Sequence, residues 1–92
     1  MFENDDSIEA VKADQARKRV VEDFKWLMAH RQGRRVMWGL LEKTGVHHNP
    51  WNNSDSVTAF NCGRMNVGQE YQGEIMDHCP EQYLLMLKER NE

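Results

Sequence analysis

The stretch from Gly33 to Gly45 constrains the fold of this chain most, because its apolar residues recur at the spacing of a helix. Val36 and Leu40 are four residues apart, and each is followed by a second large apolar residue. This pattern forms an apolar stripe over about three helical turns. Gly45 then has the place of a left-handed C-cap, which predicts that the helix ends at residue 44.

Spacings of three and four residues between apolar side chains also run through residues 13–28, 57–75 and 83–87. Each favours a helix, and no segment shows the strict alternation of a strand. Pro50 and Cys79-Pro80 mark the two clearest interruptions. The sequence therefore predicts one all-α domain over residues 1–92, a small bundle of about four helices with no sheet. Its parts are a flexible lead-in at 1–6, helices at 7–29, 33–44, 55–78 and 80–90, and a loop at 46–54.

The apolar stripes also predict which side chains form the core. The set contains Phe24, Leu27, Val36, Trp38, Leu40, Phe60, Val67 and Tyr83. Arg64 occupies one place in the apolar row of the third helix. Three glycines, Gly63, Gly68 and Gly73, lie in the same helix at a cost of about 1 kcal/mol each. Close packing against a neighbouring helix is favoured over a hinge as the reason for them.

Composition excludes several classes of protein. The formal net charge is -3, which argues against a general nucleic-acid coat. No window approaches the length and hydropathy of a transmembrane helix, and the polar start is unlike a signal peptide. Two cysteines do not make a disulfide framework, so we expect synthesis in a reducing cytoplasm.

The residue pattern favours no catalytic or metal chemistry. The histidines and cysteines lack the spacing of a structural zinc site; they are His47, His48, Cys62, His78 and Cys79. Glu70, Glu74 and Asp77 share a helix face, which is typical of a solvated acidic surface. We therefore expect no enzymatic activity, no metal and no cofactor.

A cluster of arginines is the main candidate for a binding surface. Arg31, Arg34 and Arg35 lie within five residues at the start of the central helix, and Arg64 could join them from the third helix. Guanidinium groups there suit a phosphate, the carboxylates of a neighbouring subunit, or acidic residues of the same chain such as Asp23 or Glu42. Trp51 lies in a polar loop and could instead anchor an interface. Alternatively, Arg31, Arg34 and Arg35 could contact nucleic acid together with Lys25.

Three blocks of residues resemble a family of small proteins that tailed bacteriophages, notably short-tailed ones, encode among their virion assembly genes. The blocks lie within residues 24 to 89. They are Gly33-Arg34-Arg35-Val36 with Trp38, Leu40, Leu41 and Gly45; Ala59-Phe60 with Gly63-Arg64 and Asn66-Val67-Gly68; and Pro80-Glu81 with Tyr83, Met86 and Glu89.

The resemblance implies a helical virion protein present in several copies. It further implies a homo-oligomer whose partners are the phage portal or other virion proteins, at the head-tail junction or among the internal proteins ejected with DNA. DNA contact is a secondary expectation, and an assembly factor absent from the finished particle is the alternative. On this view Arg34, Arg35 and Arg64 hold the fold or an acidic neighbour together.

Overall fold

The computed structural model describes the backbone of residues 2–91 and the side chains of residues 7–91. Four helices follow one another in the chain: α1 (Phe2–Ala29), α2 (Arg31–Thr44), α3 (Asp55–His78) and α4 (Pro80–Glu89). The described residues contain no strand. The predicted fold class, a small all-α bundle without a sheet, is confirmed.

Two helix starts differ from the sequence expectation. α1 begins at Phe2, so the backbone of residues 2–6 is helical where a flexible lead-in was expected. α2 begins at Arg31, directly after an extended His30 with φ -103° and ψ 139°. The turn between α1 and α2 is thus a single residue.

The helix ends follow local chemistry. Gly45 adopts the left-handed conformation with φ 68°, and its N-H donates to the Glu42 carbonyl, which confirms the predicted C-cap. The hydroxyl of Ser54 accepts from the N-H of Val57 at the start of α3. Pro80 stands in the first turn of α4, where its missing N-H leaves no helical hydrogen bond unmade.

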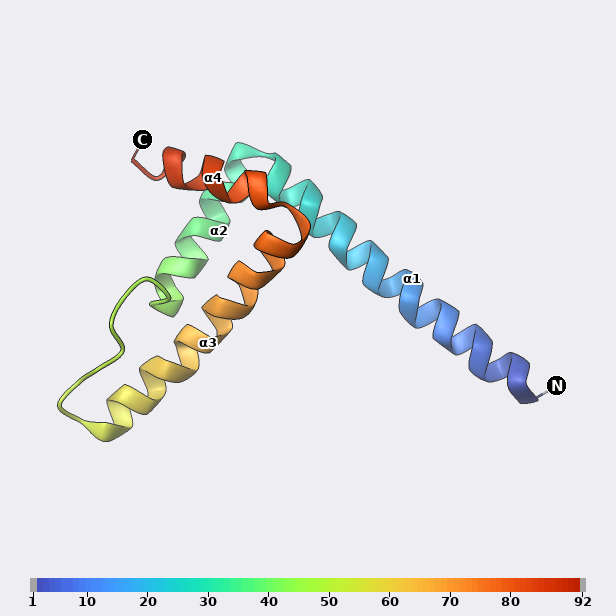
Figure 1. The fold of residues 1–92 in the computed structure, drawn as a ribbon, viewed down its shortest axis with the longest axis horizontal. Coiled ribbons are helices and arrows are strands. Elements are labelled where there is room, and N and C mark those ends of the chain that lie inside the picture. Colours follow the sequence, from blue (N-terminus) through green and yellow to red (C-terminus); the bar gives the residue numbers. More distant parts are fainter. Residues whose placement is uncertain (1, 92) are drawn as a thin grey trace.

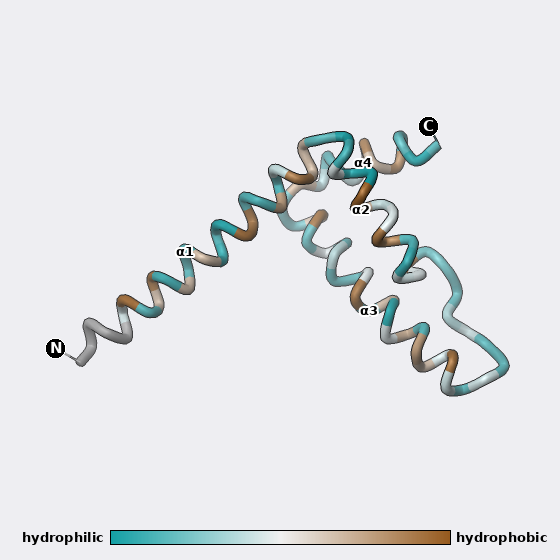
Figure 2. Tube along the Cα trace, turned by 180° about the vertical axis from the view of Figure 1, so that it is seen from behind, coloured by the Kyte–Doolittle hydropathy of each residue, from teal (hydrophilic) through white to brown (hydrophobic). Residues whose placement is uncertain are grey.

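The helices form an open shape. In Figure 1, α2, α3 and α4 lie together, while most of α1 projects away from them. The radius of gyration of the Cα atoms is 17.6 Å, whereas a compact domain of this length has about 12 Å. Figure 2 shows apolar segments along α1 well away from the other helices. We call residues 7–23 of α1 the arm, and α2 to α4 with the end of α1 the body.

The core of the body is small and rich in methionine. Its buried side chains are Met28, Met37, Leu41, Ile75, Cys79 and Met86. Four of the predicted core residues, Phe24, Leu27, Trp38 and Tyr83, pack against this cluster while remaining partly exposed.

The other four predicted core residues are exposed, which corrects that prediction. Val36 is 57% exposed, Leu40 45%, Phe60 65% and Val67 46%. Each lies on one flank of its helix, because the body covers only a narrow stripe of α2 and α3. The apolar spacing predicts a helix correctly. It does not predict which side of the stripe is buried, because that depends on where the other helices lie.

Two glycines permit close approach between elements. A Cβ at Gly33 would lie 1.9 Å from the carbonyl oxygen of Leu27, and one at Gly68 would lie 2.2 Å from Oγ1 of Thr44. Among the glycines of α3, close packing therefore accounts for Gly68. Gly63 and Gly73 have no neighbour within 4 Å of such an atom.

Candidate functional site

Three of the arginines singled out in the sequence lie together at the start of α2. Arg31 is the first residue of that helix, and Arg34 and Arg35 follow within its first two turns. With Trp38 they line a hollow of about 330 Å³, whose other walls are Met86 and Glu89 of α4 and Arg90, the residue after that helix. We call these seven residues the arginine cluster.

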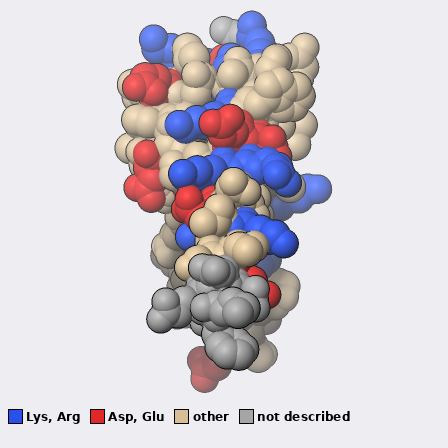
Figure 3. Space-filling view, turned by 90° about the vertical axis from the view of Figure 1, so that its right-hand side faces the viewer, with Lys and Arg blue, Asp and Glu red and all other residues tan. Residues whose placement is uncertain are grey.

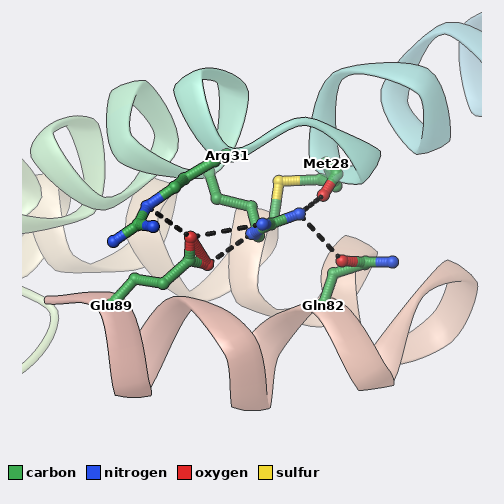
Figure 4. Close-up of polar contacts among 5 residues, drawn as sticks. Met28, Arg31, Gln82 and Glu89 are labelled. Carbon is green, nitrogen blue, oxygen red and sulfur yellow. Dashed lines mark hydrogen bonds and ion pairs between the residues drawn. The ribbon is translucent and has the colours of Figure 1, made fainter.

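Arg34 is the centre of the cluster and is only 9% exposed. Its Nε and Nη2 donate to the two carboxylate oxygens of Glu89 at 2.6 and 3.2 Å. Its Nη1 donates to the backbone carbonyl of Met28 at 2.9 Å and to Oε1 of Gln82 at 3.1 Å. These contacts, seen in Figure 4, join the end of α1, the start of α2 and α4 through one guanidinium.

Glu89 is paired with two arginines. Nε of Arg31 lies 3.2 Å from Oε2 of Glu89, in addition to the paired contact from Arg34. The hydrogen bond from Arg34 lowers the pKa of Glu89; desolvation opposes this, and the charges of Arg34, Arg31 and Arg35 lower the pKa further. The carboxylate is therefore held in its ionised form.

Arg34 contacts an acidic group of its own chain, which is one of the alternatives that the sequence leaves open. The carboxylate is Glu89, and not Asp23 or Glu42, which are the nearest acidic residues in the sequence. Two signals pointed to it: Glu89 stands in the third block of the family resemblance, and it shares one face of α4 with Gln82 and Met86 at spacings of four and three.

Trp38 forms the aromatic wall of the cluster. The guanidinium carbon of Arg90 lies 5.6 Å from the centroid of its ring, and the ring of His47 stacks on it with centroids 5.1 Å apart. His47 is itself held by Oε1 of Glu42 at 3.3 Å and by the amide of Gln72 at 3.0 Å. These contacts fix the tryptophan between α4 and the loop after α2.

Arg64 and Trp51 lie outside the cluster. Arg64 donates to the carbonyl of Lys43 at 3.4 Å and to Oδ1 of Asn61 at 3.0 Å, and its guanidinium stands 5.2 Å above the ring of Phe60. Trp51 is 69% exposed in the loop before α3. The structure therefore does not join these two residues to the three arginines of α2.

The charge of the cluster is uneven. It holds four arginines and one glutamate, of which Arg35 and Arg90 are exposed at the rim. On the face seen along α1 in Figure 3, by contrast, acidic and basic side chains interleave. The positive charge at the rim of the cluster could attract a carboxylate or a phosphate.

The histidines and cysteines outside the cluster do not gather at one place in the described part of the chain. His78 lies 3.1 Å from Oε2 of Glu74. Cys62 is exposed and Cys79 is buried; burial, and then the charge of Glu81, raises the pKa of the Cys79 thiol. Across the described residues, no three histidine, cysteine or acidic side chains are placed to hold one metal ion.

Comparison with known proteins identifies the family. The family model described as Bbp19-like phage protein matches residues 24–88 of the chain. The chain belongs to this family of Bbp19-like phage proteins. The Bbp19-like match runs from Phe24 to Lys88, so it covers the body as far as the residue before Glu89 and excludes the arm. No curated protein and no solved structure matches the chain. Within the described part of the chain, no helix is long and apolar enough to cross a membrane.

Proposed function

We propose that this Bbp19-like protein is a structural component of the phage particle that acts by packing several copies against one another. Its proposed location is the head-tail junction, beside the portal, or the set of internal proteins ejected with DNA. One observation supports this proposal most strongly: a broad apolar surface of the body is uncovered in the single chain.

Helix geometry places this surface on the side of the body opposite α4. On α2, the flank that faces α4 carries Arg34 and Trp38, so Val36 and Leu40 lie on the other flank. On α3, Gln72 reaches Tyr83 of α4. The side chains turned away from α4 on α3 are Phe60, Val67 and Tyr71.

The two flanks adjoin. Arg64, which lies in the same row of α3, reaches across to the carbonyl of Lys43 on α2. We call the combined surface the apolar face: Val36, Leu40, Phe60, Val67 and Tyr71. All five side chains are at least 43% exposed. A patch of this kind marks a protein interface in a soluble protein, and a small core gains stability from association.

Two measurements test the proposal together. Mass spectrometry of purified virions should detect the chain, and light scattering of the purified protein should give a multiple of its 10.9 kDa mass. A monomer that is absent from virions would refute the structural role and leave an assembly factor as the explanation.

The rim of the arginine cluster favours a second candidate, a nucleic-acid-binding accessory protein. Arg35 and Arg90, which are exposed at the rim, could contact phosphates beside Trp38, whereas Arg31 and Arg34 are paired with Glu89. Two phosphate contacts would make the logarithm of the binding constant fall with the logarithm of salt concentration at a slope of about -2. Absence of DNA binding at low salt would eliminate this candidate.

A further inference from the structure

We propose that the arm of one copy packs along α3 on the apolar face of a second copy. The inference deepens the proposed function and rests on it, because it names the surfaces by which the copies assemble. Its evidence is the spacing, size and charge of the side chains on the two helices.

Both helices carry a repeat of alternating three-residue and four-residue spacings. On α1 the repeat is Ala10, Ala13, Arg17, Val20 and Phe24. On α3 it is Phe60, Arg64, Val67, Tyr71, Glu74 and His78. Such repeats define the contact stripe of two helices that wrap around each other. Most of each stripe is exposed in the single chain: Val20 is 67% exposed and Phe60 65%.

Size and charge agree in one parallel register. With Ala10 opposite Val67, Ala13 falls beside Tyr71, so small side chains meet large ones. Arg17 then falls opposite Glu74. Arg17 and Lys18 are otherwise paired with Asp14 of their own helix, with both basic side chains more than 70% exposed. The acidic side of α3, at Glu70, Glu74 and Asp77, suits this basic stretch. With Ala10 still opposite Val67, an antiparallel arm would place Arg17 opposite Phe60, away from the acidic side of α3.

The arm of the same chain cannot reach this position without breaking the body. The carbonyl of Met28 accepts from Arg34, and the Met28 side chain is completely buried. The backbone of Leu27 lies against Gly33 with no room for a Cβ. These contacts hold α1 at its angle to α3. A groove lined by Arg17, Lys18 and Val20 of α1 and by Glu74 and His78 of α3 lies between the two helices of one chain, and Arg17 and Lys18 are paired there with Asp14. The occupant that we assign to the stripe of α3 is the arm of another copy.

Disulfide trapping between two differently tagged copies tests the proposal. In a Cys62→Ser background, one copy carries Ala10→Cys and the other carries Val67→Cys. We expect a mixed disulfide-linked dimer after oxidation. Lys12→Cys is the matched control, because residue 12 lies on the opposite side of the arm; it should give little cross-linking with Val67→Cys. Helicity measured by circular dichroism confirms that each variant is folded.

Charge reversal provides a second readout. Arg17→Glu or Glu74→Lys alone should weaken association about threefold to tenfold, and the two together should restore it. Lys12→Glu should leave association unchanged. A particle-bound oligomer without the Ala10→Cys to Val67→Cys cross-link would refute the arm contact and leave the proposed function intact. A cross-link within one chain that carries both cysteines, rather than between chains, would also refute it, because the chain's own arm would then close on α3.

Discussion

At the scale of single residues, Arg34 and Gly33 determine how α1 meets the body. Arg34 binds the last turn of α1 and two side chains of α4. Gly33 lets the backbone of Leu27 lie against the start of α2. Arg34 supplies directional hydrogen bonds, whereas Gly33 supplies only the space that a side chain would otherwise fill.

Gly33→Ala should destabilise the protein by about 2 kcal/mol, because the added methyl group would collide with a carbonyl oxygen that cannot move alone. Gly39→Ala in the same helix is the control. Nothing lies within 4 Å of a Cβ at that position, so this change should stabilise the protein by about 0.5–1 kcal/mol. Chemical denaturation monitored by circular dichroism measures both. Equal effects of the two changes would contradict the close approach at Gly33.

Glu89 should make the stability of the protein sensitive to acid. Its pKa is lowered in the folded chain, so its contribution is fully present above the pKa that it has in the unfolded chain. That contribution is lost as the pH falls through the lower folded pKa. Glu89→Gln should remove this part of the pH dependence and lower stability at neutral pH. Unfolding curves between about pH 2 and 7 would show it; an unchanged acid slope in the variant would contradict the assignment.

At the scale of helices, local signals located the elements well. Gly45, Ser54 and Pro80 each act through their own backbone or through a hydrogen bond within three residues. The buried side of each helix depends instead on where the other helices lie. For that reason the sequence pattern does not distinguish Val36 and Leu40 from Met37 and Leu41 as core residues, and the structure buries only the second pair.

The candidate site was predictable to a similar degree. Arg31, Arg34 and Arg35 come together because they are close in sequence. Glu89 is 55 residues from Arg34 in the sequence, and no local pattern predicts a contact between residues so far apart. Arg64 and Trp51 remained apart from the cluster because the loop and α3 carry them elsewhere.

Deleting the arm should leave the body folded. The described arm side chains are mostly exposed, and the contacts of α1 with the core begin at Phe24. A variant lacking residues 2–19 should therefore keep the unfolding temperature of the isolated chain within about 3 °C. Deleting residues 80–91 is the control and should unfold the body, because Met86 and Glu89 are lost. Thermal unfolding at low protein concentration makes the comparison; collapse of the arm deletion would show that the arm supports the core.

At the scale of the whole molecule, the chain is extended at 60 × 35 × 16 Å and its core holds few large side chains. A protein of this kind gains stability when a partner covers its apolar surface. We expect the unfolding temperature to rise with protein concentration, because association stabilises only the folded chain.

Scanning calorimetry over a hundredfold range of concentration measures this effect. Phe60→Ser should reduce the dependence, since it removes an exposed apolar side chain from the apolar face. Ser56→Ala changes a residue that is one turn away and also exposed, and it should leave the concentration dependence of the unfolding temperature unchanged. A constant unfolding temperature across the range would show that the native chain does not associate.

The single-residue turn at His30 has a consequence for symmetry. Because the connection is so short and Arg34 bonds to both α1 and α4, the angle between α1 and the body is fixed. In a ring joined through such arms, that angle sets the rotation from each subunit to the next, and so the number of subunits that closes the circle. Changes at this junction should then alter the copy number of the ring before they abolish assembly.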